Sequence, residues 1–125
     1  MPPLRVLVVE DSEDNLMLMK IQLEDLGYRV VAARTGKAAI EAARSQHPDL
    51  VISDLHMPEM DGWELLKLIR EIPTLASIPA IALSGTSFEL EIRQAHAAGY
   101  SIHLTKPVDP EHLASAIKSL AHAAG

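Results

Sequence analysis

The chain has 125 residues, which predicts a single domain over residues 1–125 with a folded core at about 4–121. It has no cysteine, which excludes a disulfide framework and thiolate chemistry, and its 17 acidic against 11 basic side chains disfavour a nucleic-acid partner. No apolar run approaches the roughly 20 residues of a membrane span and the N-terminus lacks a signal-peptide pattern, so we expect no membrane association and a cytoplasmic location.

The first half of the chain alternates short runs rich in Val, Leu and Ile with longer segments of helical periodicity. In chain order these predict a strand over 4–9, a helix from the cap Ser12 to Leu26, a strand over 28–33, a helix from the cap Thr35 to Gln46, and a strand over 50–53 that ends at Asp54. Gly27 is placed to end the first helix.

The second half repeats the alternation. In chain order we expect a helix capped by Asp61 that runs from near Trp63 to before Pro73, a strand over 79–83, a helix capped by Thr86 that stops at Gly99, a weak strand over 100–105, and a helix over 110–121 capped by Asp109. Five strand–helix units in strict alternation predict an α/β protein with a doubly wound parallel sheet and helices on both faces.

Polar residues follow the apolar runs where the predicted strands end. They are Glu10, Asp11, Asp54, Ser84, Thr105 and Lys106. Because the carboxyl ends of parallel strands share one edge, where ligands bind, we expect these side chains to lie together. Three neighbouring carboxylates favour a hard cation such as Mg²⁺. A carboxylate nucleophile, a metal, a lysine and a hydroxyl are the parts of a phosphoryl-transfer site, so the hypothesis is that Asp54 becomes an aspartyl phosphate.

Each of these residues also has a structural explanation when it is taken singly. Asp11 can cap or favour the N-terminus of the next helix, and Asp54 can stand at the start of a loop. Lys106 can be an exposed charge and Ser84 a turn residue. Their common place at one edge of the predicted sheet is what favours a shared site.

Four motifs together resemble the response-regulator receiver domains of two-component signalling, over about residues 4–121. They are Val8-Val9-Glu10-Asp11-Ser12, the loop Ser53-Asp54-Leu55-His56-Met57-Pro58-Glu59-Met60-Asp61-Gly62, Ala82-Leu83-Ser84-Gly85, and Leu104-Thr105-Lys106-Pro107. The resemblance implies a flavodoxin-like fold, with five parallel strands in the order 2-1-3-4-5 flanked by five helices.

The resemblance implies a metal site and an acceptor. Asp54 is implied as the phosphoacceptor. Asp11, Asp54 and the backbone carbonyl of His56 are implied as ligands of Mg²⁺ (or Mn²⁺), with Glu10 acting through water.

The resemblance also implies the groups that bind the phosphoryl group. Lys106 is expected to pair with a phosphoryl oxygen, and the Ser84 hydroxyl to turn inward toward it. The bond between Lys106 and Pro107 is expected to be cis, although most X–Pro bonds are trans.

Two positions depart from the pattern of the family. Three residues before Lys106, a Tyr or Phe usually tracks the switch hydroxyl, but here the residue is His103, which can couple the switch to pH. The simpler interpretation of His103 is an ordinary exposed strand residue. Gly85 stands where Ala is commoner. Variation at His56 and Thr86, and with them Gly85, is expected to tune the lifetime of the aspartyl phosphate.

The resemblance implies a signalling switch rather than an enzyme, with at most self-phosphorylation and self-dephosphorylation. The donor would be a histidine kinase or a histidine phosphotransfer protein. The added charge would change a face formed by residues 87–98 and 100–121, to which a downstream protein or a second copy of the chain binds. The chain is expected to be a single-domain regulator or the receiver of a hybrid histidine kinase.

Other classes remain as alternatives. A haloacid-dehalogenase-type phosphatase is disfavoured because His56 stands where its second catalytic aspartate is needed. A dinucleotide- or flavin-binding module is disfavoured because no G-x-G-x-x-G follows the first strand. A receiver-like scaffold that binds proteins and is never phosphorylated is the remaining alternative.

Overall fold

The computed structural model describes residues 4–85 and 88–124 and contains the predicted alternation of strands and helices. In chain order the elements are β1 (Arg5–Val9), α1 (Glu13–Asp25), β2 (Arg29–Ala33), α2 (Gly36–Gln46), β3 (Leu50–Asp54), α3 (Gly62–Arg70), a 3₁₀ turn (Pro73–Leu75), β4 (Ala80–Ser84), α4 (Glu89–Ala97), β5 (Ile102–Thr105) and α5 (Pro110–Ala124). All paired strands are parallel, and their order is β2-β1-β3-β4-β5. The predicted doubly wound sheet and its strand order are therefore confirmed.

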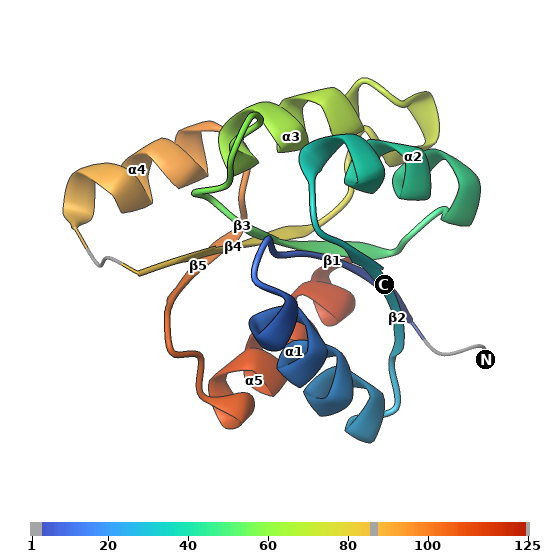
Figure 1. Cartoon of the computed structure of the whole chain (residues 1–125), viewed down its shortest axis with the longest axis vertical. Helices are drawn as coiled ribbons and strands as arrows, with labels where there is room; N and C mark the ends of the chain where they lie inside the picture. Colours follow the sequence, from blue (N-terminus) through green and yellow to red (C-terminus); the bar gives the residue numbers. More distant parts are fainter. Residues whose placement is uncertain (1–3, 86–87, 125) are drawn as a thin grey trace.

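Helices cover both faces of the sheet: α1 and α5 lie on one face and α2, α3 and α4 on the other (Figure 1). Successive strand residues point to opposite faces, so Val6 and Val8 enter the core under α1 and α5, whereas Leu7 and Val9 enter the other. The central strands β3 and β4 are buried along their whole length. Such continuous apolar runs are what a two-sided parallel sheet requires.

Side-chain caps fix where the first three helices begin. The Ser12 hydroxyl accepts a hydrogen bond from the Asn15 amide, the Thr35 hydroxyl from the Ala38 amide, and the Asp61 carboxylate from the Glu64 amide. These three caps are the predicted ones, and each satisfies an amide that has no partner within its helix.

The fourth and fifth helices differ from the prediction at one end each. Helix α4 begins at Glu89 after Phe88, whose side chain makes no capping bond, and the predicted cap Thr86 lies outside the described residues. Helix α5 continues to Ala124, beyond the predicted end near Ala121, because its alanine-rich end favours helix. Its first turn is capped as predicted, since the Asp109 carboxylate accepts from the Glu111 amide at 2.8 Å.

Two glycines end helices in the left-handed region of backbone space. Gly27 has φ +94° after α1 and Gly99 has φ +108° after α4, both at predicted helix ends. Over residues 4–85 and 88–124, no helix is both long and apolar enough to cross a membrane.

Candidate functional site

Asp54 is the last residue of β3, where the buried central strand leaves the core, and it is only 5% exposed. The loop after it folds back closely, so that the Gly62 amide donates to the Leu55 carbonyl at 3.0 Å. A Cβ on Gly62 would lie 2.5 Å from the Asp54 carbonyl oxygen. Tyr100 also holds the start of α3, because its hydroxyl donates a hydrogen bond to the Gly62 carbonyl at 2.6 Å. A glycine is therefore required for α3 to start against the end of β3.

Three carboxylates converge at this edge of the sheet. Glu10, Asp11 and Asp54 each offer an oxygen within 4.8 Å of the others. Glu10 is only 3% exposed, and its burial raises the pKa of its carboxyl, against the lowering effect of its hydrogen bond to Lys106. Clustered carboxylate oxygens are the donors that hard divalent cations prefer, so these residues fit a site for such a metal ion.

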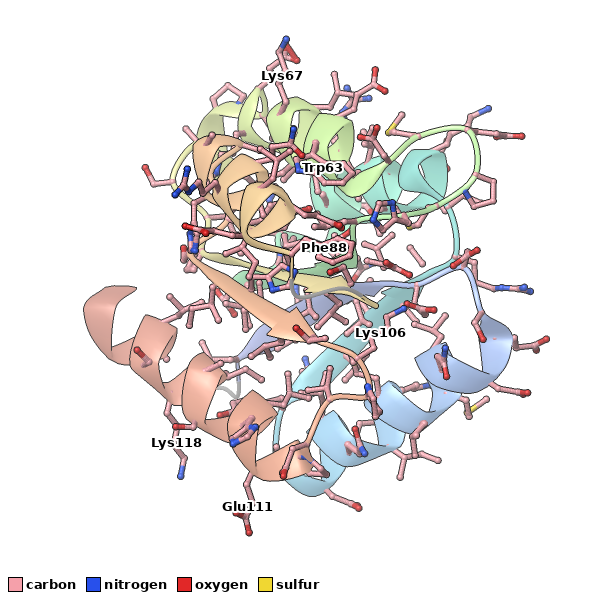
Figure 2. The ribbon with its side chains drawn as sticks, turned by 90° about the vertical axis from the view of Figure 1, so that its left-hand side faces the viewer. Trp63, Lys67, Phe88, Lys106, Glu111 and Lys118 are labelled. Atoms are coloured by element: carbon pink, nitrogen blue, oxygen red, sulfur yellow. The ribbon has the colours of Figure 1, made fainter. Side chains whose placement is uncertain are left out.

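Lys106, which Figure 2 labels just after β5, brings a positive charge into the acidic cluster. Its Nζ donates to Asp54 Oδ2 at 2.7 Å and to Glu10 Oε2 at 2.9 Å. Burial alone would lower the pKa of Lys106, but the hydrogen bonds to Asp54 and Glu10 prevail and raise it, so the ammonium stays charged at neutral pH. Lys106 supplies one positive charge to a cluster of three carboxylates, so the charge of the cluster favours a second cation. The Lys106–Pro107 peptide bond is cis, as the resemblance implied.

The structure places Ser84 at the buried end of β4, next to β5. Its hydroxyl lies 2.8 Å from Nε2 of His103, the residue at which the chain departs from the family pattern. His103 is therefore not a simple surface residue. Burial lowers the pKa of His103, with Glu91 opposing that effect and His96 adding to it. The imidazole and the hydroxyl form one hydrogen-bonded unit across two neighbouring strands.

Two residues expected to tune the site lie in the loop after β4. Gly85 is exposed, and a Cβ added to it would meet no atom within 4 Å. Thr86 lies outside the described residues.

His56 joins Asp54 to the neighbouring helices α3 and α4. Its amide donates to Asp54 Oδ1 at 3.1 Å, and its ring Nε2 lies 2.5 Å from Glu91 Oε1 on α4. The ring also meets the indole of Trp63 edge-on, with centroids 5.4 Å apart. Trp63 is partly buried. Glu91 belongs to no motif, so sequence reasoning missed it; only the packing of α4 beside the loop brings it to His56.

An apolar surface adjoins the site along α1. A depression on this side is lined by Glu10 and Lys106 of the site together with Leu18, Met19 and Val108. Leu18 is also exposed, at 55%, as are its helix neighbours Met17 and Ile21. Exposed apolar side chains that are contiguous with a polar site are typical of a protein-binding surface.

Comparisons with known proteins agree on one family. Residues 6–118 match the family model described as the response regulator receiver domain. The polar-differentiation response regulator DivK of Brucella ovis is 32% identical over 91% of this chain and 93% of its own. The structure superposes on the chemotaxis protein CheY4 of Vibrio cholerae with a TM-score of 0.90, at 30% identity over 94% of this chain and 98% of that one.

A third neighbour is the receiver domain of the sensor histidine kinase PA1611 of Pseudomonas aeruginosa. Its TM-score is 0.86, at 27% identity over 94% of this chain and 96% of that one. That structure is described as having a magnesium ion coordinated in the active site cleft.

Proposed function

Because the chain belongs to the response regulator receiver family of two-component signalling, we propose that it is a phosphoacceptor switch whose acceptor is Asp54. The observation that carries this proposal is the contact of Lys106 with both Asp54 and Glu10 inside a cluster of three carboxylates. That arrangement combines a nucleophilic carboxylate with a fixed cation beside it, which suits transfer of an anionic phosphoryl group. The proposed unit is one receiver domain over residues 1–125, with its core at about 4–121.

The proposed reaction moves a phosphoryl group from a phosphohistidine to the chain. A carboxylate oxygen of Asp54 forms a new P–O bond, the P–N bond of the donor breaks, and a proton goes to the departing imidazole nitrogen. Lys106 stabilises the charge on the transferred group, and Ser84 donates a hydrogen bond to it after leaving His103. The chemistry of the chain is limited to its own phosphorylation and dephosphorylation.

A divalent cation, Mg²⁺ or Mn²⁺, would be held by Asp11, Asp54 and the backbone carbonyl of His56, with Glu10 acting through water. When bound, it supplies positive charge to phosphoryl oxygens that the carboxylates would otherwise repel. The excess of carboxylates over Lys106 supports this assignment. The magnesium described in the PA1611 receiver domain supports it as well.

The side chains around the acceptor are proposed to set how long the phosphoryl group stays. His56 and Thr86 would flank the path of an attacking water, and Gly85 would leave that path open. His103 would act as the switch partner of Ser84 in place of the usual aromatic residue, because the two already share a hydrogen bond.

The output surface is proposed to be the face of α4, β5 and α5. Phe88 and Leu90 support it, since they are large apolar side chains exposed at 75% and 68% where α4 begins. The added phosphoryl charge would draw Ser84 inward, and His103 in β5 would follow. A downstream protein, or a second phosphorylated copy of the chain, would bind there.

The phosphodonor is proposed to be a histidine kinase or a histidine phosphotransfer protein that docks over α1. The depression shared by Glu10, Lys106 and Leu18 supports this choice, because a donor histidine that reaches Asp54 must approach along the same edge. Such docking would serve either a single-domain regulator or the receiver of a hybrid kinase.

The test is the intact mass of the protein after incubation with acetyl phosphate and Mg²⁺. We expect wild type to gain one phosphoryl group, about 80 Da, and Asp54→Asn to gain none. Asp14→Asn, an exposed acid on α1, is the matched control and should react like wild type. If wild type gains no mass and also binds no beryllofluoride, the protein is a scaffold with the receiver fold that binds proteins without being phosphorylated.

A further inference from the structure

A side-chain hydrogen bond joins the loop between β3 and α3 to α4 beside the candidate site. His56 Nε2 lies 2.5 Å from Glu91 Oε1. A carboxylate can only accept, so the ring nitrogen donates. The Glu91 side chain is only 14% exposed, whereas the His56 side chain is 61% exposed. The carboxylate is thus enclosed beside the loop while the ring reaches to it from the surface.

The same histidine is tied to the acceptor through its main chain. Its amide donates to Asp54 Oδ1 at 3.1 Å, which orients the carboxylate that is proposed to take the phosphoryl group. Its ring is also braced by Trp63 of α3, which lies beside α4 in Figure 2. Hydrogen bonds therefore connect Asp54, the backbone and ring of His56, and the α4 residue Glu91 in one continuous series.

Glu89, two residues earlier on the same helix, makes a different kind of contact from that of Glu91. It pairs with Arg93 one turn along α4, and both side chains are largely exposed. Such an exposed pair within one helix contributes little and links no other element. Of the two acidic residues in the first turn of α4, Glu91 is the one whose side chain hydrogen-bonds to the loop between β3 and α3 in the described structure.

We propose that Glu91 is a positioning residue for the acceptor site: through His56 it holds the loop that carries the proposed metal-binding carbonyl, and it thereby couples occupancy of that site to the position of α4. The coupling is reciprocal, because any change in α4 that releases Glu91 also changes the affinity of the site. The hydrogen bonds of this route differ from the one between Ser84 and His103, although the charge of Glu91 acts on His103 as well. This inference rests on the proposed function, because only that proposal makes the backbone carbonyl of His56 a metal ligand.

The experiment measures Mg²⁺ binding by calorimetry on wild type, Glu91→Gln, His56→Ala, the double variant and the control Glu89→Gln. Each variant keeps the backbone carbonyl at position 56. We expect Glu91→Gln to weaken Mg²⁺ binding about fivefold, the order expected when a carboxylate acceptor is replaced by the weaker neutral acceptor of an amide, while Glu89→Gln leaves it unchanged. In the His56→Ala background, Glu91→Gln should have no further effect, because the double-mutant cycle isolates a contact between the two residues.

Hydrogen exchange of the α4 amides provides a readout that does not depend on phosphorylation. Mg²⁺ should slow exchange in α4 of wild type and do so less in Glu91→Gln. If Glu91→Gln binds Mg²⁺ as tightly as Glu89→Gln, or if its effect is the same with and without His56, the role of Glu91 is wrong and the proposed function stands. If wild type itself binds no Mg²⁺, the proposed metal site fails, and the role of Glu91 fails with it.

Discussion

At the scale of single residues, the candidate site depends on which polar side chains meet as they leave the sheet. Lys106 contacts Asp54 and Glu10 although 52 and 96 residues separate them in the chain. Ser84 contacts His103 in the same way across a strand pair. The first contact keeps the Asp54 carboxylate beside a fixed positive charge, and the second gives the Ser84 hydroxyl a titratable partner.

The contact with His103 predicts a pH dependence of stability. Burial lowers the pKa of His103 from 6.5, so the unfolded chain binds this proton more tightly than the folded one. The folded state therefore has its full stability at a pH above the pKa of His103 in the unfolded chain. It loses stability as the pH drops through that pKa toward the lower pKa of His103 in the folded chain. Compared with wild type, His103→Gln should lose less stability on acidification.

Urea unfolding at about pH 7.5 and about pH 5.5 measures this difference. The difference in unfolding free energy should be a fraction of about 1.4 kcal/mol per pH unit, which is the limit for one proton. It stays below that limit because the His103 ring is partly exposed, so solvent screens its interactions with Glu91 and His96. His112→Gln, an exposed histidine on α5, is the control and should match wild type. Equal losses in wild type and His103→Gln would contradict the assignment.

At the scale of elements, α3 packs closely against the end of β3, so Asp54 and the helix after it are held together. Asp61 caps the helix at 2.9 Å, and the Tyr100 hydroxyl holds the Gly62 carbonyl from the far side. The close approach of Gly62 to the Asp54 carbonyl oxygen is what allows this arrangement. Asp54 therefore lies on backbone that cannot shift far without moving α3.

This packing predicts that Gly62→Ala is destabilising, by about 2 kcal/mol, because the added Cβ overlaps the backbone at the end of β3. Gly85→Ala is the matched control, since its Cβ would meet nothing within 4 Å, and it should leave stability nearly unchanged. Denaturant unfolding of the two variants gives the comparison. A stability of Gly62→Ala equal to that of Gly85→Ala would show that the loop has room to relax.

At the scale of the whole molecule, the fold concentrates negative charge at one edge of a sheet in a chain of net charge −6. Glu10, Asp11 and Asp54 come from two strand ends that the sheet places side by side. The unfolded chain has no such cluster. A cation that binds only the folded state must therefore stabilise it by mass action.

We accordingly expect Mg²⁺ to raise the unfolding free energy by about 2.7 kcal/mol at a concentration roughly one hundred times its Kd. Asp11→Asn should lose most of this gain, because one of the three carboxylates is gone, whereas Asp14→Asn should keep it. Thermal unfolding with Mg²⁺ and with a chelator makes the comparison. A gain that persists in Asp11→Asn would place the cation elsewhere on the acidic surface.

Local signals in the sequence predict the strand and helix pattern, because apolar runs, caps such as Ser12 and Asp61, and terminal glycines act over a few neighbouring residues. Recognisable motifs also identified Glu10, Asp11, Asp54 and Lys106, and the parallel sheet brings these four together. Three contacts could be found only in the folded molecule: Glu91 with His56, Ser84 with His103, and Gly62 with the end of β3. These contacts arise from how α3, α4 and β5 pack, and packing between distant segments leaves no local signal in the chain.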